Sequence, residues 1–186
     1  MAAFPDYFLI DNIEVISNIP TVASESQSLI TYVRLRNAQR WDINLDCRTK
    51  PWDTKKAFAF QNSLKAGSVV NEFTLPVFGE SAASDTTALT AEAIGATTIE
   101  VSNVTDVEIG DYVGFAGHTK VYLITDINVN ELTFFPNLTS AVAISEGVTF
   151  NPEFTVRLSN IPRFRSASAR QPQTFTFISI VTGKQS

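Results

Sequence analysis

A strict alternation of apolar and polar side chains runs through residues 41–47, Trp-Asp-Ile-Asn-Leu-Asp-Cys. Successive side chains of a β-strand point to opposite faces, so this pattern predicts a strand with one buried face and one polar face. The whole chain contains 14 Phe and many Thr, Val and Ile, all of which favour strands. Turn residues separate the stretches in which they occur. We therefore expect a mainly β protein.

A single helix is predicted directly after this strand, near residues 51–65. Pro51 stands at an early helical position, Asp53 falls in the first turn, and Gly67 follows the expected end. Apolar side chains recur near helical spacing within it and are expected to face the core: Trp52, Ala57, Phe60 and Leu64.

The charge of the chain changes sign twice along the sequence. Residues 71–156 hold twelve Asp or Glu and one Lys, a net charge of −11, whereas the remaining residues hold seven acids and thirteen Lys or Arg, a net charge of +6. The two outer pieces share a composition that the middle lacks, which indicates one module inserted into another. We expect residues 1–80 and 151–186 to form one discontinuous β domain.

Residues 81–150 are expected to form the inserted acidic domain. Short strand-like segments alternate there with turn residues such as Asn103, Gly110 and Gly147. This pattern predicts a small β-barrel. The polar stretch Ser81 to Thr87 is interpreted as a linker from which this domain projects.

The sequence offers no clear catalytic or cofactor site, and we expect a protein that is not an enzyme and carries no cofactor. His118 is the only histidine, and it is interpreted as a turn or surface residue because no orienting partner is evident. With Cys47 as the only cysteine, the chain can form neither an intramolecular disulfide nor a zinc site of its own, and Cys47 is expected to be buried.

Two weaker motifs are interpreted as structural. The acids Asp106, Glu108 and Asp111 lack the glycine and the closing glutamate of a calcium loop, and are expected to be solvated. Gly114 and Gly117 lack the lysine and hydroxyl residue of a phosphate loop. No segment begins like a signal peptide or has the length of a membrane span, so we expect a soluble protein.

Arginines cluster in two places and are the candidate subunit contacts. Long cationic side chains protect strand edges and pair with acids of a neighbouring chain. The basic loop near residues 163–170 has few aromatic residues, so a solvated or subunit-contacting face is preferred to nucleic-acid recognition. The candidates are Arg34, Arg36, Arg40, Arg48, Arg163, Arg165 and Arg170.

The order of elements resembles that of a known family. A strand at Arg40-Trp-Asp-Ile-Asn-Leu, the helix, and Glu72-Phe-Thr-Leu-Pro-Val-Phe precede an insertion centred on Ile109-Gly-Asp-Tyr-Val-Gly-Phe; Phe154-Thr-Val-Arg-Leu and a final β segment follow it. From residue 40 onward this resembles bacteriophage tail-tip proteins of the distal tail or minor tail type.

The resemblance implies a split β-barrel with a side helix, related to the tail tube subunit, and assembly into a hexameric ring at the distal end of the tube. It implies a structural virion protein, made in the host cytoplasm, that joins the tube to the baseplate or tail-tip hub. Its partners would be further copies of itself, the tail tube protein and other tail-tip proteins. Genomic DNA would pass through the lumen without specific binding, and no membrane would be involved.

Three other functions stay open. Exposed aromatic side chains of the insertion could form a carbohydrate- or receptor-binding surface, the candidates being Tyr112, Tyr122, Phe134 and Phe135. The chain could instead be the tail tube subunit itself, which would polymerise into long tubes. An enzyme that depends on His118 is the third alternative.

Overall fold

The computed structural model describes residues 2–25, 31–35, 39–64, 71–74, 81–160 and 173–179. The structure is mainly β, with one α-helix among the described residues, which confirms the fold class expected from the sequence. The described strands form two six-stranded sheets and one two-stranded sheet.

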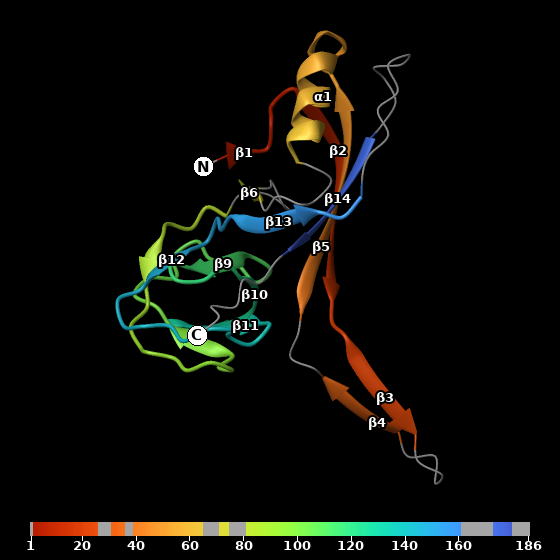
Figure 1. Cartoon of the computed structure of the whole chain (residues 1–186). Coiled ribbons are helices and arrows are strands. Elements are labelled where there is room, and N and C mark those ends of the chain that lie inside the picture. The colour runs from red at the N-terminus through yellow and green to blue at the C-terminus, as the bar shows by residue number, and fades with distance from the viewer. Residues whose placement is uncertain are drawn as a thin grey trace.

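The first six-stranded sheet, here called the outer sheet, is built from the two ends of the chain (Figure 1). Its central pairing joins β5 to β14, and β13 returns the chain from the middle segment to lie against β6. Its strands, in spatial order, are β1 (Ala2–Ala3), β6 (Asn71–Thr74), β13 (Phe154–Leu158), β14 (Gln173–Ser179), β5 (Arg40–Thr49) and β2 (Phe8–Asn18).

The second six-stranded sheet, here called the barrel, is built from the middle of the chain. An isolated antiparallel bridge between Ala88 and Val101, flanked by the hydrogen bond from Ser102 N to Thr87 O of 2.9 Å, joins its first strand to its last. The sheet therefore closes on itself. Its strands, in spatial order, are β7 (Thr86–Thr87), β12 (Gly147–Thr149), β9 (Tyr112–Phe115), β10 (Val121–Asn128), β11 (Glu131–Phe135) and β8 (Thr98–Glu100).

The chain enters and leaves the barrel at one point. Ser81 N donates to Asn151 Oδ1 at 3.1 Å, and Asn151 Nδ2 donates back to Ser81 O at 3.2 Å. The two residues are 70 positions apart in sequence, yet they close the connection. Whether each sheet also folds as an independent domain stays a prediction.

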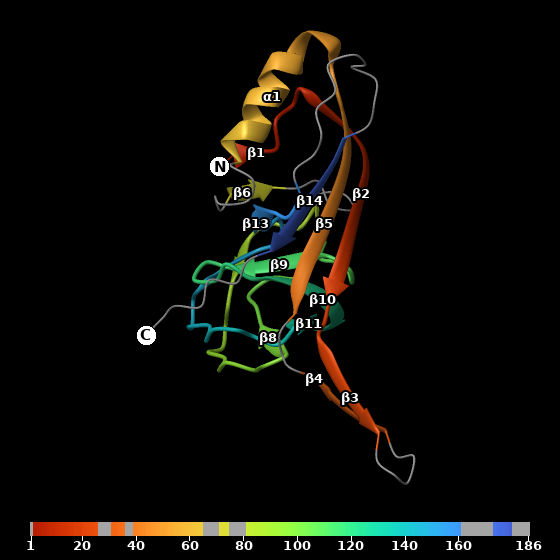
Figure 2. The ribbon, with the colours of Figure 1, turned by 45° about the vertical axis from the view of Figure 1, so that its right-hand side comes forward.

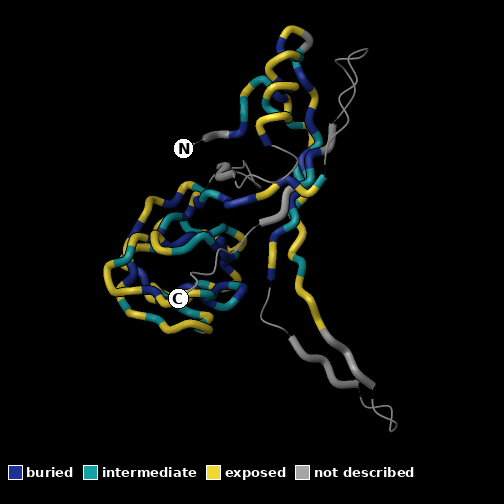
Figure 3. Tube along the Cα trace, in the orientation of Figure 1, coloured by how far each residue is buried: buried dark blue, intermediate teal, exposed yellow. Residues whose placement is uncertain are grey.

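The outer sheet buries one face of β5, as the alternation in the sequence predicts. Trp41, Ile43, Leu45 and Cys47 are buried, whereas Arg40 at the start of the strand is exposed. The two ends of this face are covered by different elements: an aromatic cluster beneath the helix at one end, and the barrel at the other. The Cα trace in Figure 3 shows the helix near one end of the long strands and the barrel beside the other. The cluster consists of Phe4, Phe8, Phe60 and Phe175, with ring centroids 5.3–6.5 Å apart.

The helix is α1 (Thr54–Ser63), preceded by the 3-10 turn η1 (Pro51–Asp53). It buries Ala57 and Leu64 as expected, but Trp52 is 79% exposed, so its assignment to the apolar face was wrong. Trp52 precedes Ala57 by five positions, which at 3.6 residues per turn places the two about 140° apart around the helix axis. No helix of the described residues has the length and apolar character of a membrane span.

A two-stranded ribbon extends away from both sheets. β3 (Thr21–Glu25) continues the direction of β2, and β4 (Thr31–Leu35) leads back towards β5; among the described strands these two pair only with each other. Both views show the ribbon, here called the hairpin, projecting beyond the barrel (Figures 1 and 2).

Only part of the segment from Ser81 to Thr87, which was predicted as a linker, connects the two sheets. Thr86 and Thr87 form barrel strand β7, Thr86 is buried, and its Oγ1 lies 2.7 Å from Ser102 Oγ. The prediction that the barrel projects from a linker was also wrong, because the barrel packs directly on the outer sheet. The next subsection describes that contact.

Candidate functional site at the barrel junction and the open strand edge

Lys120 joins the barrel to the base of the hairpin. Its side chain is only 3% exposed, and its Nζ donates to both the main-chain oxygen and Oε1 of Gln39. Gln39, also buried, donates through Nε2 to Ser17 Oγ at 3.1 Å. Burial penalises the charged ammonium and lowers the pKa of Lys120 to about 8. A cation from the acidic middle of the chain is thus enclosed where barrel, β2 and β5 meet.

Trp41 is the second element of this junction. Its indole Nε1 donates to Val121 O at 2.8 Å in a buried position. The Trp41 ring packs edge-on against Tyr112 at 5.6 Å, and Tyr112 packs in the same way against Phe154 at 5.5 Å. Val121 belongs to the hydrophobic core of the outer sheet, so this core extends onto the barrel, whose own interior forms a separate cluster.

The backbones also approach closely at the junction. A Cβ added at Gly114 in β9 would lie 2.8 Å from Pro152 Cβ and 3.4 Å from Thr149 Cγ2. Only glycine therefore fits at this position without displacing Pro152, which follows the exit from the barrel. The barrel is held against the outer sheet by hydrogen bonds, ring packing and this close contact.

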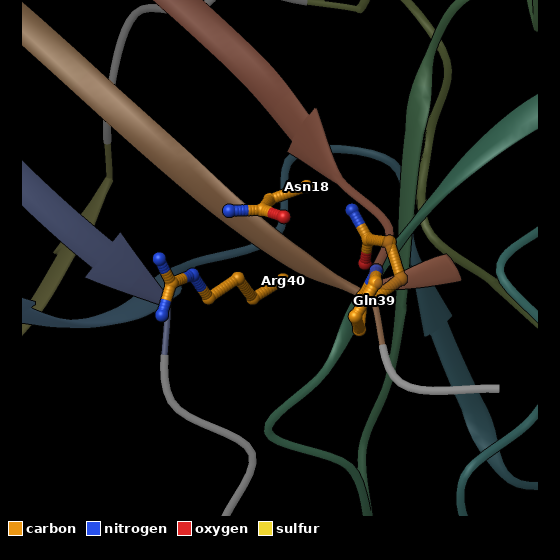
Figure 4. A pocket seen from close by; sticks show the side chains of 4 residues that line it. Asn18, Gln39 and Arg40 are labelled. Atoms are coloured by element: carbon orange, nitrogen blue, oxygen red, sulfur yellow. The ribbon is translucent and has the colours of Figure 1, made fainter. Parts of the chain in front are cut away.

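A pocket of about 350 Å³ opens beside this junction, where the hairpin leaves the outer sheet. It is lined by Asn18, Pro20, Gln39 and Arg40. Figure 4 shows the side chain of Arg40 pointing away from Gln39. Arg40 Nε lies 2.9 Å from Asp42 Oδ1, and Asn18 Nδ2 donates to Asp42 Oδ2 at 3.0 Å. Asn18 and Arg40, which line the pocket, thus both contact the Asp42 carboxylate at the base of the hairpin.

The outer sheet ends in a long open edge. β2 spans 11 residues and, among the described strands, pairs with β5 alone. It contains no Lys and no Pro, two residues that commonly protect an edge against further pairing, although a bulge between Ile10 and Asn12 interrupts the strand. Ile10, Ile13 and Val15 on this strand are partly exposed although they pack against the core. The edge therefore offers main-chain hydrogen-bonding groups and apolar side chains to another strand.

The predicted arginine contacts do not form one cluster in the described structure. Arg48 pairs with Asp11 of β2, its Nε donating to Oδ2 at 2.6 Å, and this bond lowers the pKa of the Asp11 carboxyl. Arg40 pairs with Asp42, as described above, at the other end of β5. Arg34 lies on β4 opposite Val22. Their role in subunit contacts stays a prediction; the remaining candidates, Arg36, Arg163, Arg165 and Arg170, lie outside the described residues.

The groups considered for chemistry have structural partners. His118 Nδ1 lies 3.0 Å from Tyr122 Oη, and its ring packs on Phe115. The Asp111 carboxylate accepts hydrogen bonds from Ser81 Oγ at 2.7 Å and from Glu108 N at 3.0 Å. In the described part of the chain, no three His, Cys, Asp or Glu side chains are grouped as a metal site.

The cysteine and two of the four candidate sugar-binding aromatics are buried. Cys47 is fully buried, as predicted, and burial is the main cause that raises the pKa of its thiol to about 12. Tyr122 and Phe134 are buried in the barrel core, so they cannot form an exposed stacking surface. Tyr112 is occupied at the junction with Trp41.

The sequence did not predict this junction, and it suggested other roles for Trp41, Tyr112 and Gly114. The one available signal was Lys120 itself, the only Lys or Arg between residues 71 and 156. A scan against protein-family models finds no match for this chain, and a comparison with curated proteins finds none either.

Proposed function

We propose that this chain is a structural subunit that assembles with copies of itself into a closed ring. In the setting that the family resemblance implies, the ring stands at the distal end of a phage tail tube and joins the tube to the baseplate or tail-tip hub. The observation that carries the proposal is the open edge of β2, which continues into the projecting hairpin.

The open edge favours assembly because an unpaired strand binds another strand readily. Ten of the 11 residues of β2 pair with β5, with a bulge at Asp11, so a neighbouring strand would meet a preformed template. The partly exposed Ile10, Ile13 and Val15 would be covered by such a neighbour. Identical subunits joined by two different faces form a closed ring when the rotation between them closes.

The hairpin supports the same conclusion. An isolated two-stranded hairpin is only marginally stable in water, and β3 and β4 pair only with each other among the described strands. A neighbouring subunit that packs against the hairpin would supply the missing contacts. Lys120 and Gln39 hold the base of the hairpin, which fixes the direction in which it can reach a neighbour.

Shortening the hairpin tests the proposal. Thr21 and Leu35 are paired, so residues 22–34 can be replaced by an Asn-Gly turn between them without disturbing Gln39. The full chain should give ring-sized particles by light scattering, and the shortened chain should stay folded and monomeric. A full chain that remains monomeric at high concentration would refute the ring. A shortened chain that assembles normally would show that the hairpin takes no part in the contact between subunits.

The tail tube subunit remains the alternative, since the same edge and hairpin support it. The two proposals differ in the particle that forms: a terminal ring stops at one closed annulus, whereas a tube subunit polymerises into long tubes. Electron microscopy of the purified protein separates them.

A further inference from the structure

The turn η1 and the helix α1 expose two large apolar side chains that have lysines close to them in sequence. Trp52 is 79% exposed and Phe58 is 54% exposed, and the exposed lysine Lys55 lies between them in sequence. Asp53, the only acid from residue 50 to residue 64, is buried and paired with Lys56 at 2.8 Å. We call Trp52, Lys55 and Phe58 the helix patch.

The barrel carries a second exposed apolar surface. Ile94 is 69% exposed, Ile144 is 64% exposed and Leu89 is 48% exposed. Their two loops run side by side, joined by the antiparallel bridge between Glu92 and Val142 and by the hydrogen bond from Ser145 N to Ala88 O of 2.8 Å. We call Leu89, Ile94 and Ile144 the barrel patch.

The barrel as a whole is acidic. Residues 81–150 contain nine Asp or Glu and a single Lys or Arg, which is Lys120. Lys120 is buried at the junction, so it contributes no cation to the barrel surface. Two barrel patches would therefore repel each other, whereas a patch with exposed lysines would be attracted.

We propose that the helix patch of one copy binds the barrel patch of the next copy in the ring. The inference rests on the proposed function and names one contact between neighbouring subunits. Trp is the residue most enriched among those that dominate binding energy, and apolar contact rimmed by opposite charges combines affinity with register. A second copy is the occupant because its helix patch has the opposite charge around a similar apolar surface.

The positions of the two patches make the contact head to tail. α1 lies at the opposite end of the outer sheet's buried face from the barrel, so one copy cannot join its own patches (Figure 1). A contact between two different faces repeats from copy to copy, and it closes into a ring when the rotation allows.

Two variants and their mixture test this contact in the full chain. Trp52→Ser removes the helix patch and Ile144→Ser removes the barrel patch, both at exposed positions that contribute little to the core. Each variant alone should need at least a tenfold higher concentration to assemble than the wild type. An equal mixture should form particles of two chains at concentrations where each variant alone is monomeric, because the intact helix patch of one variant can bind the intact barrel patch of the other.

Ile109→Ser is the matched control. Ile109 is 65% exposed and lies near Asp111, whose carboxylate is bonded to Ser81 at the base of the barrel. This variant should assemble like the wild type, and all variants should keep the wild-type circular dichroism. If the wild type and both patch variants assemble equally, or if the mixture stays monomeric, the patch contact is refuted while the ring stands. A monomeric wild type refutes the ring itself.

Discussion

The buried amine of Lys120 makes the free energy of unfolding of the chain depend on pH. The ordinary pKa of a lysine is 10.5, and burial lowers that of Lys120 to about 8 in the folded chain. Between these values the unfolded chain binds a proton that the folded chain does not, so stability rises as the pH increases. Integrating this difference from pH 7 to pH 9.5 gives a gain of about 2 kcal/mol in the free energy of unfolding. The neutral amine still donates to Gln39, so the junction is retained.

Lys120→Met isolates this contribution. The variant keeps an apolar side chain of similar length but cannot titrate. Between pH 7 and pH 9.5 the free energy of unfolding should therefore rise by about 2 kcal/mol more in the wild type than in the variant. Urea denaturation followed by far-ultraviolet circular dichroism at both pH values measures the difference, and Lys55→Met at an exposed site is the matched control. Equal pH dependence in the wild type and Lys120→Met would show that the amine is not desolvated, and would refute the enclosed junction.

Three further predictions follow from the same structure. Trp41→Phe keeps an aromatic ring but leaves Val121 O without its buried donor, and should lower the free energy of unfolding by about 1–3 kcal/mol in chemical denaturation. Gly114→Ala should destabilise the chain by about 1–3 kcal/mol because the added carbon collides with Pro152, whereas Gly147→Ala, with its nearest neighbour at 3.6 Å, should not show this collision cost. Cys47 should resist thiol reagents at pH 8 in the native chain and react after unfolding, because its thiol is buried with a pKa of about 12; rapid labelling of the native chain would contradict this burial.

The sequence predicted those elements whose pattern is local. The alternation at residues 41–47 is set by neighbouring side chains, and β5 buries the face it predicts. The helix was found from Pro51 and its apolar spacing, although Trp52 was assigned to the wrong side. That error arose because a spacing of five positions, from Trp52 to Ala57, is about 140° around the axis at 3.6 residues per turn, so the two side chains do not share a face.

Features that depend on distant parts of the chain could not be predicted in this way. β7 has only two residues in a polar stretch, and it becomes a strand because β12 pairs with it some 60 positions later. Lys120 is buried by Gln39, which lies 81 positions away. The charge of Arg48 suggested a contact between subunits, whereas the structure pairs it with Asp11 of its own chain, 37 positions away. Residue type alone does not say which partner a charged side chain will meet.

The most direct test of the account is an electron micrograph of the purified full chain at high concentration. The account predicts closed annular particles of uniform size. Isolated monomers would contradict the proposed assembly through the β2 edge and the hairpin. Long tubes would show that the chain is the tail tube subunit and not the subunit of a terminal ring.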